Sequence, residues 1–281
     1  MSDKAGLFRP DSLSEALHLL ATVPDSRPLA GGASLIAMIN ARIVEPAALV
    51  SVTQIAELRG IRVSPSGEIV IGASTRHRDI AEETRLSGTL AVVPDAAGQI
   101  ASATIRNMGT IGGSIAHADP GLDFPPALVA AGAVVEVAST AGRRRIPIVE
   151  FFVDWYATAL SPGEIVVAVH LPKPKPGVGL YLKHRRVAGD FAIVSIALSR
   201  ALDGETHIAV GGCGPTPVAS AEADRILSCS TSGAALAQAG EVLTALADPV
   251  DDVRGTAEYR RLLIPRMLRR AMFDAAAKSA A

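Results

Sequence analysis

The sequence predicts a protein of mixed helices and strands that is divided into two domains, and three observations support this. The chain has 281 residues, more than one small core requires, so two compact domains are expected. Hydrophobic residues make up 49% and charged residues 20%, which is typical of a folded globular chain and not of a disordered one. Segments with helical periodicity are interleaved with β-rich runs along the whole length.

The first 103 residues contain four predicted helices, and two of them begin beside a residue that can cap a helix. Residues 12–22 repeat apolar side chains at helical spacing, and Asp11 or Ser12 can cap the start of that helix. Thr75 is a candidate cap for a second helix over residues 77–83. The other elements expected in this part are strands at 27–30, 49–53 and 69–74, and helices at 34–41 and 91–103.

Residues 104–126 differ from the rest of the chain because they are rich in Gly, Pro, Asp and Asn and show no hydrophobic period. A connection of this length is uncommon unless it carries a function, so we predict a functional loop. After this loop we expect a hairpin of strands 134–138 and 145–148 around Ala141-Gly142, a helix at 149–160 and a strand at 164–171.

The segment Pro-Lys-Pro-Lys-Pro-Gly at 172–177 is the best linker in the chain. Alternating proline and lysine form a stiff, solvated spacer. It predicts a domain boundary, with the first domain at 1–173 and the second at 178–281. In the second domain we expect strands at 179–185, 192–198 and 207–211, a turn at Asp203-Gly204, and helices at 219–228, 232–247 and 256–278.

Charge and residue counts exclude several functions. The net charge of −1 favours neither nucleic acid nor more than peripheral contact with a membrane, and no apolar run is long enough to span a bilayer. The N-terminus has no apolar secretory core, so we expect a cytoplasmic protein. Cys213 and Cys229 are too few thiols for a zinc ribbon or a four-thiolate cluster. No two histidines have the i, i+4 spacing of a helical metal site, so no metal site is predicted.

Two glycine loops are the candidate binding elements. Ala30-Gly31-Gly32-Ala33-Ser34 follows a predicted strand, and Thr110-Ile111-Gly112-Gly113-Ser114 lies in the long loop. Paired glycines allow backbone N–H groups to approach a phosphate, and Ser34 and Thr110 add hydroxyl donors. Neither loop matches the Walker A or the G-x-G-x-x-G pattern. The alternative is that each loop is only a tight turn. Together, the two loops could hold the two halves of a pyrophosphate.

Several further segments occur together with these loops. They are IGAST at 71–75, TIRNMGTIGGSIAHADPGLDFPPAL at 104–128, the pattern Tyr181-x-Lys183…Arg186…Asp190, and GTAEYRRLLIPRMLRRA at 255–271. With AGGAS at 30–34, they run in order through essentially the whole chain. On these segments the chain resembles the FAD-binding medium subunits of molybdenum hydroxylases, a family that includes carbon monoxide dehydrogenase medium subunits and xanthine dehydrogenase flavin domains.

The resemblance implies an α+β fold. A FAD-binding domain of two subdomains, about 1–55 and 56–173, would precede a smaller α+β C-terminal domain at 178–281. FAD would lie between them without a covalent link, since no cysteine or histidine stands at a plausible attachment site. The family's pyrophosphate contacts correspond to the first loop, Ala30, Gly31, Gly32, Ala33 and Ser34, and to the second, Thr110, Ile111, Gly112 and Gly113.

Five further residues correspond to family positions around the cofactor. Asp123 matches the carboxylate that holds the ribose, and Lys183 a lysine near the flavin; their alternative roles are a helix cap and a solvated strand lysine. Ile100 and Val166 match apolar residues beside the adenine, or are core residues. Phe191 stands where a relative has a tyrosine against the flavin ring, and core packing is its alternative role.

The resemblance also implies a role in electron transfer. The molybdenum cofactor and [2Fe-2S] clusters would sit on a large and a small partner subunit, with the whole doubled into a dimer of heterotrimers. This chain would carry no catalytic acid or base. Two alternatives stay open: a self-sufficient FAD-dependent reductase or oxidase of related fold, and a scaffold subunit without flavin. The substrate of the complex and its acceptor (quinone, NAD or oxygen) are open on sequence alone.

Overall fold

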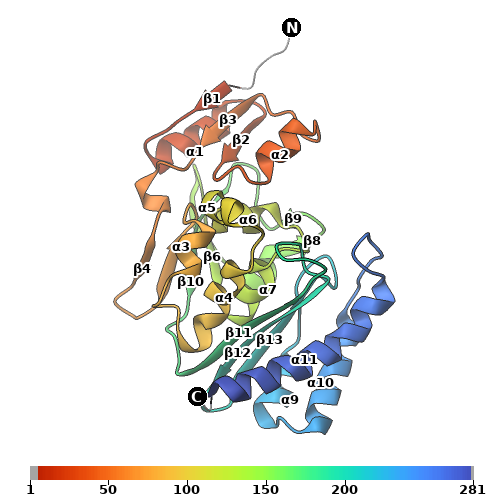
Figure 1. Cartoon of the computed structure of the whole chain (residues 1–281). Coiled ribbons are helices and arrows are strands. Elements are labelled where there is room, and N and C mark those ends of the chain that lie inside the picture. Colours follow the sequence, from red (N-terminus) through yellow and green to blue (C-terminus); the bar gives the residue numbers. More distant parts are fainter. Residues whose placement is uncertain (1–5, 280–281) are drawn as a thin grey trace.

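The N-terminal part of the chain forms a small module at the top of the molecule (Figure 1). The structure is a computed structural model that describes residues 6–279. Ser12 accepts a hydrogen bond from the Glu15 amide and starts the first helix, which buries Leu13, Ala16 and Leu17, as predicted. A parallel sheet of order β1-β3-β2 lies beside two helices. The elements are β1 (Gly6–Phe8), α1 (Leu13–Thr22), β2 (Ser26–Leu29), α2 (Leu35–Asn40) and β3 (Ala48–Ser51).

The middle of the molecule is an antiparallel sheet of order β4-β5-β10-β6-β7. Its central strand reads Ile-Val-Val-Ala-Val-His-Leu and is buried throughout. Such a run is typical of a strand covered on both faces. The strands are β4 (Ile61–Val63), β5 (Ile69–Gly72), β6 (Val134–Ser139), β7 (Gly142–Pro147) and β10 (Ile165–Leu171). The helices of this layer are η1 (Ala56–Leu58), α3 (His77–Ala81), η2 (Gly88–Ala91), α4 (Val92–Gly98), α5 (Ala103–Met108), α6 (Ile111–His117), α7 (Phe124–Ala130) and α8 (Ile148–Phe151).

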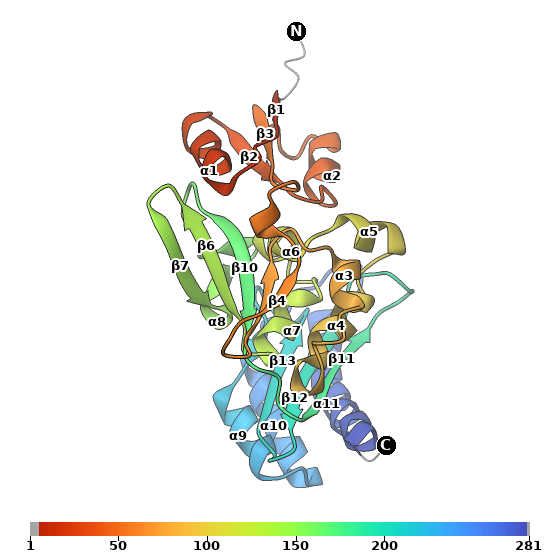
Figure 2. The ribbon, with the colours of Figure 1, turned by 90° about the vertical axis from the view of Figure 1, so that its left-hand side faces the viewer.

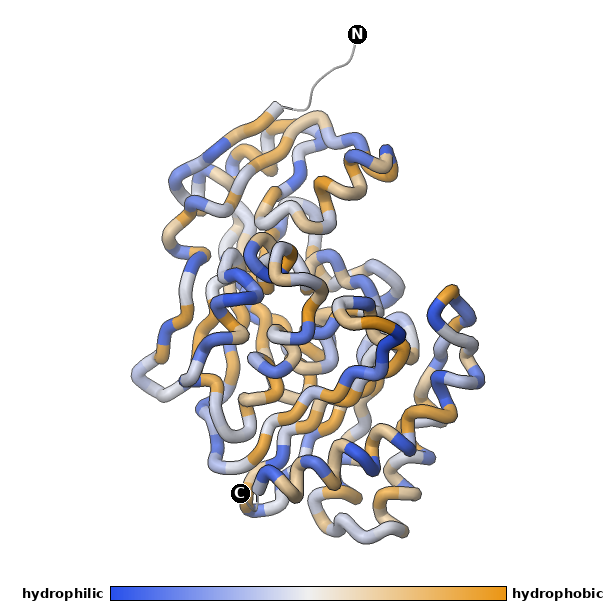
Figure 3. The backbone as a smooth tube through the Cα atoms, in the orientation of Figure 1, coloured by the Kyte–Doolittle hydropathy of each residue, from blue (hydrophilic) through white to orange (hydrophobic). Residues whose placement is uncertain are grey.

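The C-terminal part is an antiparallel meander covered by helices on one face (Figure 2). Its strands are β11 (Gly177–His184), β12 (Val194–Ala201), β13 (Thr206–Gly211) and β14 (Val218–Ala219), and its helices are α9 (Ala221–Cys229), α10 (Gly233–Leu246) and α11 (Ala257–Ser279). Ile196 and Val210 pack under the helices, whereas Ala197 and Ala209 face the core of the middle layer. In α11, hydrophobic and hydrophilic residues alternate along the tube (Figure 3), as expected for a helix with one buried face. This arrangement confirms the α+β fold class.

The prediction of a long irregular loop at 104–126 is wrong. Three short helices, α5, α6 and α7, occupy most of it, and each is too short to show a hydrophobic period. Ser102 and Thr110 cap the first two by accepting from the amides of Ile105 and Gly113. The helix predicted at 91–103 ends at Gly98, and the left-handed backbone of Ala101, with φ of 39°, prevents a continuous helix to residue 103.

The prediction of a helix over 149–160 is also wrong. The helix α8 ends at Phe151 after one turn, and a small hairpin follows, formed by β8 (Phe152–Asp154) and β9 (Ala157–Thr158). Trp155 and Tyr156 form the turn between them, and Tyr156 is left-handed, with φ of 54°. Thr75 does not cap its helix, because its hydroxyl donates to the Gly60 carbonyl instead. Three strands of two or three residues, β1, β4 and β14, were not predicted because they are too short to form a pattern.

The remaining predicted helices and strands are confirmed to within a few residues. Residues 172–175 are without regular structure and lead into β11. Within residues 6–279, no helix combines the length and the hydropathy that crossing a bilayer would need.

Candidate FAD site

A cavity of about 640 Å³ lies where the two glycine loops meet. Its volume falls within the range of about 300–1,000 Å³ that small-molecule sites occupy. The loop between β2 and α2, the helices α5 and α6, and the strands β10 and β11 contribute to its wall. Thirteen of the fourteen residues predicted from sequence line it: Ala30, Gly31, Gly32, Ala33, Ser34, Ile100, Thr110, Gly112, Gly113, Asp123, Val166, Lys183 and Phe191.

Ile111 is the exception. Its side chain is fully buried in the core of the middle layer, and its amide donates to the Thr75 carbonyl at 3.1 Å. The structure therefore gives Ile111 a packing role instead of a place on the cavity wall. Ile100 and Val166 do line the cavity, and both are also largely buried. Each of these two residues is therefore part of the core and part of the cavity wall.

The first glycine loop has the free donors that a phosphate requires. Within residues 6–279, none of the four amides of 31–34 donates a hydrogen bond to another residue. Gly32 has φ of 75°, a left-handed conformation that favours glycine. A Cβ on Gly31 would lie 1.7 Å from the Met108 carbonyl oxygen, so this loop packs directly on the end of α5.

The second loop works differently from what we predicted. The Gly112 amide donates to the Ala73 carbonyl at 2.9 Å, and the Gly113 amide donates to the Thr110 hydroxyl oxygen at 3.2 Å. These donors are therefore already used within the protein. A Cβ on Gly112 would lie 2.6 Å from the Ala73 Cβ, whereas Gly113 is exposed and its Cβ would lie 3.0 Å from the Thr110 hydroxyl oxygen and 3.7 Å from the Ala30 Cβ. The glycines here allow close packing and keep the space between the loops open.

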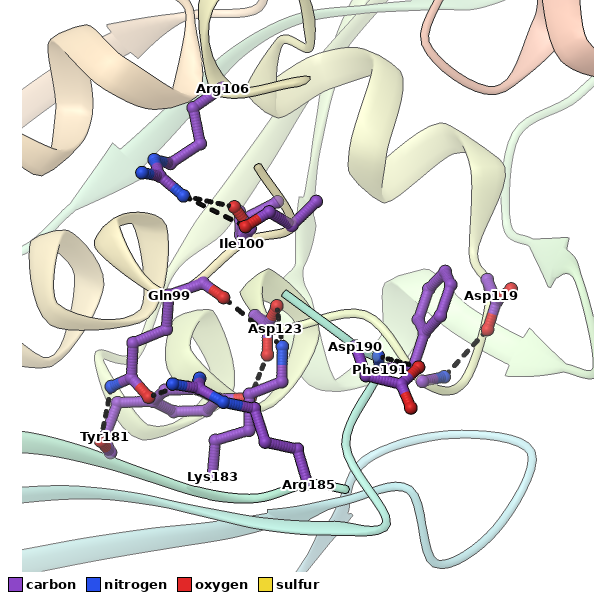
Figure 4. A network of polar contacts seen from close by, with 12 residues as sticks. Gln99, Ile100, Arg106, Asp119, Asp123, Tyr181, Lys183, Arg185, Asp190 and Phe191 are labelled. Atoms are coloured by element: carbon purple, nitrogen blue, oxygen red, sulfur yellow. Dashed lines mark hydrogen bonds and ion pairs between the residues drawn. The ribbon is translucent and has the colours of Figure 1, made fainter. Parts of the chain in front are cut away.

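Asp123 is held by two residues of β11, as Figure 4 shows. The Tyr181 hydroxyl donates to Asp123 Oδ1 at 2.6 Å, and Lys183 Nζ donates to Oδ2 at 2.9 Å. The Asp123 carboxylate makes no capping bond to α7, and the Lys183 side chain is only 1% exposed. Neither the helix-cap role nor the solvated-lysine role therefore holds. Lys183 is not a free cation beside a flavin, because its charge is paired with Asp123.

Burial sets the electrostatics of this cluster. It raises the pKa of the Asp123 carboxyl, and the neighbouring Lys183 ammonium and Tyr181 hydroxyl partly offset the rise. Burial and the adjacent Asp123 carboxylate raise the pKa of Tyr181 well above its ordinary value. Tyr181 therefore remains a protonated donor at neutral pH. The charged pair is retained inside the protein because each charge has a hydrogen-bonding partner.

The same strand is fixed to the middle layer by α4 and the residue that follows it. Asp95 Oδ2 accepts from the Tyr181 amide at 2.9 Å, and Gln99 Nε2 donates to the Tyr181 carbonyl at 2.9 Å. Arg106 donates to the carbonyl of Ile100 at 2.8 Å and so fixes the backbone on the opposite wall (Figure 4). The cavity thus has rigid walls from both parts of the chain, which reduces the conformational entropy that the protein loses when a ligand binds.

Sequence reasoning missed two histidines at this site. His77 and His117 both line the cavity, although neither was among the residues predicted for it. His77 is 5% exposed and packs edge-on against Phe124 with ring centroids 5.2 Å apart. Burial, together with the nearby Arg106 charge, lowers the pKa of His77 to about 4. Its spacing from the other histidines carried no signal, because tertiary packing alone brings it to the cavity.

The lowered pKa of His77 predicts that the protein loses stability in mild acid. Its pKa in the folded state lies below the unfolded value of 6.5, so its contribution is complete above pH 6.5 and is lost as pH falls toward 4. The loss amounts to about 3 kcal/mol over that range. In urea unfolding at pH 7 and pH 4.5, His77→Gln should lose less stability on acidification than the parent, whereas the exposed-site control His18→Gln should behave as the parent does. Equal losses in all three proteins would contradict this.

Comparison with known proteins decides the family. Residues 3–174 match the family model described as the FAD binding domain in molybdopterin dehydrogenase, and residues 180–275 match the CO dehydrogenase flavoprotein C-terminal domain. The chain belongs to this family of molybdenum hydroxylase flavoproteins.

Relatives of this flavoprotein match it over nearly its whole length. It is 37% identical over 273 residues to the 6-hydroxypseudooxynicotine dehydrogenase complex subunit alpha of Paenarthrobacter nicotinovorans, covering 94% of this chain and 92% of the relative. It is 35% identical over 278 residues to the carbon monoxide dehydrogenase medium chain of Afipia carboxidovorans, covering 96% of each. A solved chain of carbon monoxide dehydrogenase from Hydrogenophaga pseudoflava superposes with a TM-score of 0.93 at 34% identity, covering 98% of each chain.

These matches confirm four predictions made from the sequence: the family, the α+β architecture, FAD as the cofactor and the class of oxidoreductase subunit. The roles of individual residues around FAD, and the boundary between the domains, rest on geometry and remain proposals.

Proposed function

We propose that this flavoprotein is the medium subunit of a molybdenum-containing hydroxylase. A small subunit would carry the [2Fe-2S] clusters and a large subunit the molybdenum cofactor, in a dimer of heterotrimers. When bound, FAD would supply the redox chemistry of this chain, which is the transfer of electrons from the clusters to an external acceptor. The observation that carries the proposal is the single cavity in which thirteen predicted residues meet.

The residues present fit FAD. The free amides of 31–34 are suited to the pyrophosphate, and Gly113 leaves room for it between the loops. Asp123 has lone pairs beyond those used by Tyr181 and Lys183, so it can also accept from ribose hydroxyls. Ile100 and Val166 offer an apolar surface to the adenine, and Phe191 can lie against the flavin ring. The buried Asp123–Lys183 pair keeps these walls in place.

The number of cysteines indicates that the iron–sulfur clusters lie on another subunit. Two cysteines cannot hold a four-thiolate cluster, and both are free here, one buried and one exposed. We therefore place the clusters on the partner subunit.

Free thiols also favour a reducing compartment, which supports the cytoplasm as the proposed location. We place the boundary between the FAD domain and the C-terminal domain in the unstructured Pro-Lys segment at 172–175.

The purified protein should contain equimolar FAD, and acid precipitation should release all of it. The reason is that the cavity holds the cofactor through hydrogen bonds and packing, which denaturation abolishes. The measurement is the flavin absorbance of pellet and supernatant. Flavin-free protein would support a scaffold subunit instead, and a yellow pellet would indicate a covalent link. Turnover of the complex's substrate by the isolated chain would favour a self-sufficient flavoenzyme.

A further inference from the structure

The turn between α4 and α5 forms part of the wall of the FAD cavity. Ile100 and Ala101 lie in this turn, and both line the cavity. Ala101 is a non-glycine residue with φ of 39°, a left-handed backbone conformation that glycine adopts at little cost but alanine does not. Residues held in such a conformation persist only where their surroundings enforce it. This part of the wall is therefore strained, and other groups must hold it in place.

Arg106 is the side chain that holds this turn. Its Nη1 donates to the Ile100 carbonyl at 2.8 Å and to the Ala101 carbonyl at 3.1 Å. Figure 4 shows the guanidinium reaching the backbone at Ile100. Within residues 6–279, these two carbonyls are the only hydrogen-bond acceptors of Arg106. Hydrogen bonds from a charged donor are stronger than those between neutral groups, so the two bonds can offset the strain at Ala101.

Two contacts from the C-terminal part of the chain reach the same turn. Lys183 Nζ donates to the Gln99 carbonyl at 3.4 Å. Gly189 has φ of 83°, and a Cβ there would lie 3.2 Å from the Ala101 carbonyl oxygen, so its backbone packs directly on the turn. These contacts do not involve Arg106. Replacement of Arg106 should therefore loosen the turn without unfolding the protein.

Arg106 does not line the cavity itself, so it acts on a ligand only through the turn. In the proposed binding mode, Ile100 offers its apolar side chain to the adenine of FAD. The other residue proposed for the adenine, Val166, lies on β10 and does not depend on Arg106. FMN has the flavin ring and one phosphate but no adenosine, so it would gain nothing from the position of Ile100.

We propose that Arg106 is a positioning residue that makes the cavity selective for FAD over FMN. It holds the strained turn so that Ile100 lies against the adenine before the ligand binds. Without Arg106, part of the binding free energy would be spent on ordering the turn, and only a ligand with an adenosine half would lose affinity. This inference rests on the proposed function, because it needs the adenine to lie beside Ile100.

The experiment titrates the flavin-free protein with FAD and with FMN and follows the fluorescence of the flavin. Arg106→Met keeps an apolar side chain but removes both hydrogen bonds, so it should weaken FAD binding on the order of tenfold. The affinity for FMN should be unchanged. An equal loss for the two ligands would mean that Arg106 only maintains the fold, and it would overturn the proposal. An unchanged affinity for FAD would overturn it as well.

The visible circular dichroism of the FAD-saturated proteins gives a second readout. It reports on the surroundings of the flavin ring, which Arg106 does not contact in the proposed binding mode. The FAD-saturated Arg106→Met variant should therefore show the spectrum of the parent despite its weaker binding. A changed spectrum would mean that the whole cavity is disturbed, and it would overturn the assignment of Arg106 to the adenine end.

Two further variants test the cause of the effect. Arg78→Met removes an exposed arginine that contacts Asn107 of the same helix α5 at 3.4 Å, and it should bind both flavins as the parent does. In Arg106→Met/Ala101→Gly, the glycine adopts the left-handed conformation without strain, so part of the lost FAD affinity should return. No recovery in this double variant would overturn the role of the strained turn.

A failure of the proposed function would have a different result. The parent protein would then bind no FAD in this cavity. The present inference fails instead when the parent binds FAD and Arg106→Met binds it equally well, or loses FAD and FMN alike.

Discussion

Lys183→Met is expected to destabilise the protein by about 3–5 kcal/mol, because it leaves the Asp123 carboxylate buried beside an apolar side chain. The cost should shrink as pH is lowered. Removal of the ammonium takes away the group that most lowers the pKa of Asp123, so the carboxyl takes up a proton more readily in the folded state. Urea unfolding at pH 7 and pH 5 measures the free energy of unfolding and its change with pH. The FAD content of the same protein preparations is measured beside it.

The second substitution Asp123→Asn separates structure from binding. In Lys183→Met/Asp123→Asn the buried charge is gone and the amide oxygen can still accept from Tyr181, so most of the stability should return. FAD binding should stay weak, because an amide is a poorer acceptor for ribose than a carboxylate. Arg78→Met is the matched control, since the exposed Arg78–Glu82 pair contributes little. A loss below 1 kcal/mol in Lys183→Met would contradict the assigned role of the pair.

Gly113→Val is expected to reduce the FAD content of the purified protein at least tenfold. The valine side chain would occupy the space between the two glycine loops, where its Cβ would lie 3.7 Å from the Ala30 Cβ. Folding should be largely retained, because Gly113 is helical and its closest neighbour, the Thr110 hydroxyl at 3.0 Å, needs to move only slightly.

Two other glycine variants make this prediction specific. Gly112→Val should impair folding itself, since its Cβ would lie 2.6 Å from Ala73 Cβ. Gly98→Val, on an exposed helical site with no neighbour closer than 4.0 Å, should keep both stability and FAD. Normal flavin content in Gly113→Val would mean that the loops are only turns. Flavin absorbance relative to protein, with a thermal melt of each variant, is the measurement.

The sequence was informative where a short motif carries the chemistry. The first glycine loop combines a left-handed Gly32 with amides that have no partner among residues 6–279, and both features follow from its local sequence. The second loop looked equivalent, but Ala73 and Thr75 take up its amides. That pairing depends on β5 lying beside α6, which no local pattern indicates.

The rest of the site depended on contacts between distant segments. The spacing of Tyr181 and Lys183 places them on one face of a strand, yet only the fold brings Asp123 between them. The apolar run near Trp155 resembled a helix, whereas the left-handed Tyr156 turns the chain into a hairpin. The small cavity lined by Trp155 and Tyr156 was missed for that reason, because this aromatic wall lies in a segment whose secondary structure was predicted incorrectly.

The most direct measurement is an experimental structure of the FAD-loaded protein. We expect FAD in the cavity between the two glycine loops, with its pyrophosphate within hydrogen-bonding distance of the amides of 31–34 and a ribose hydroxyl on Asp123. FAD bound elsewhere, or a pyrophosphate that does not contact these amides, would contradict it.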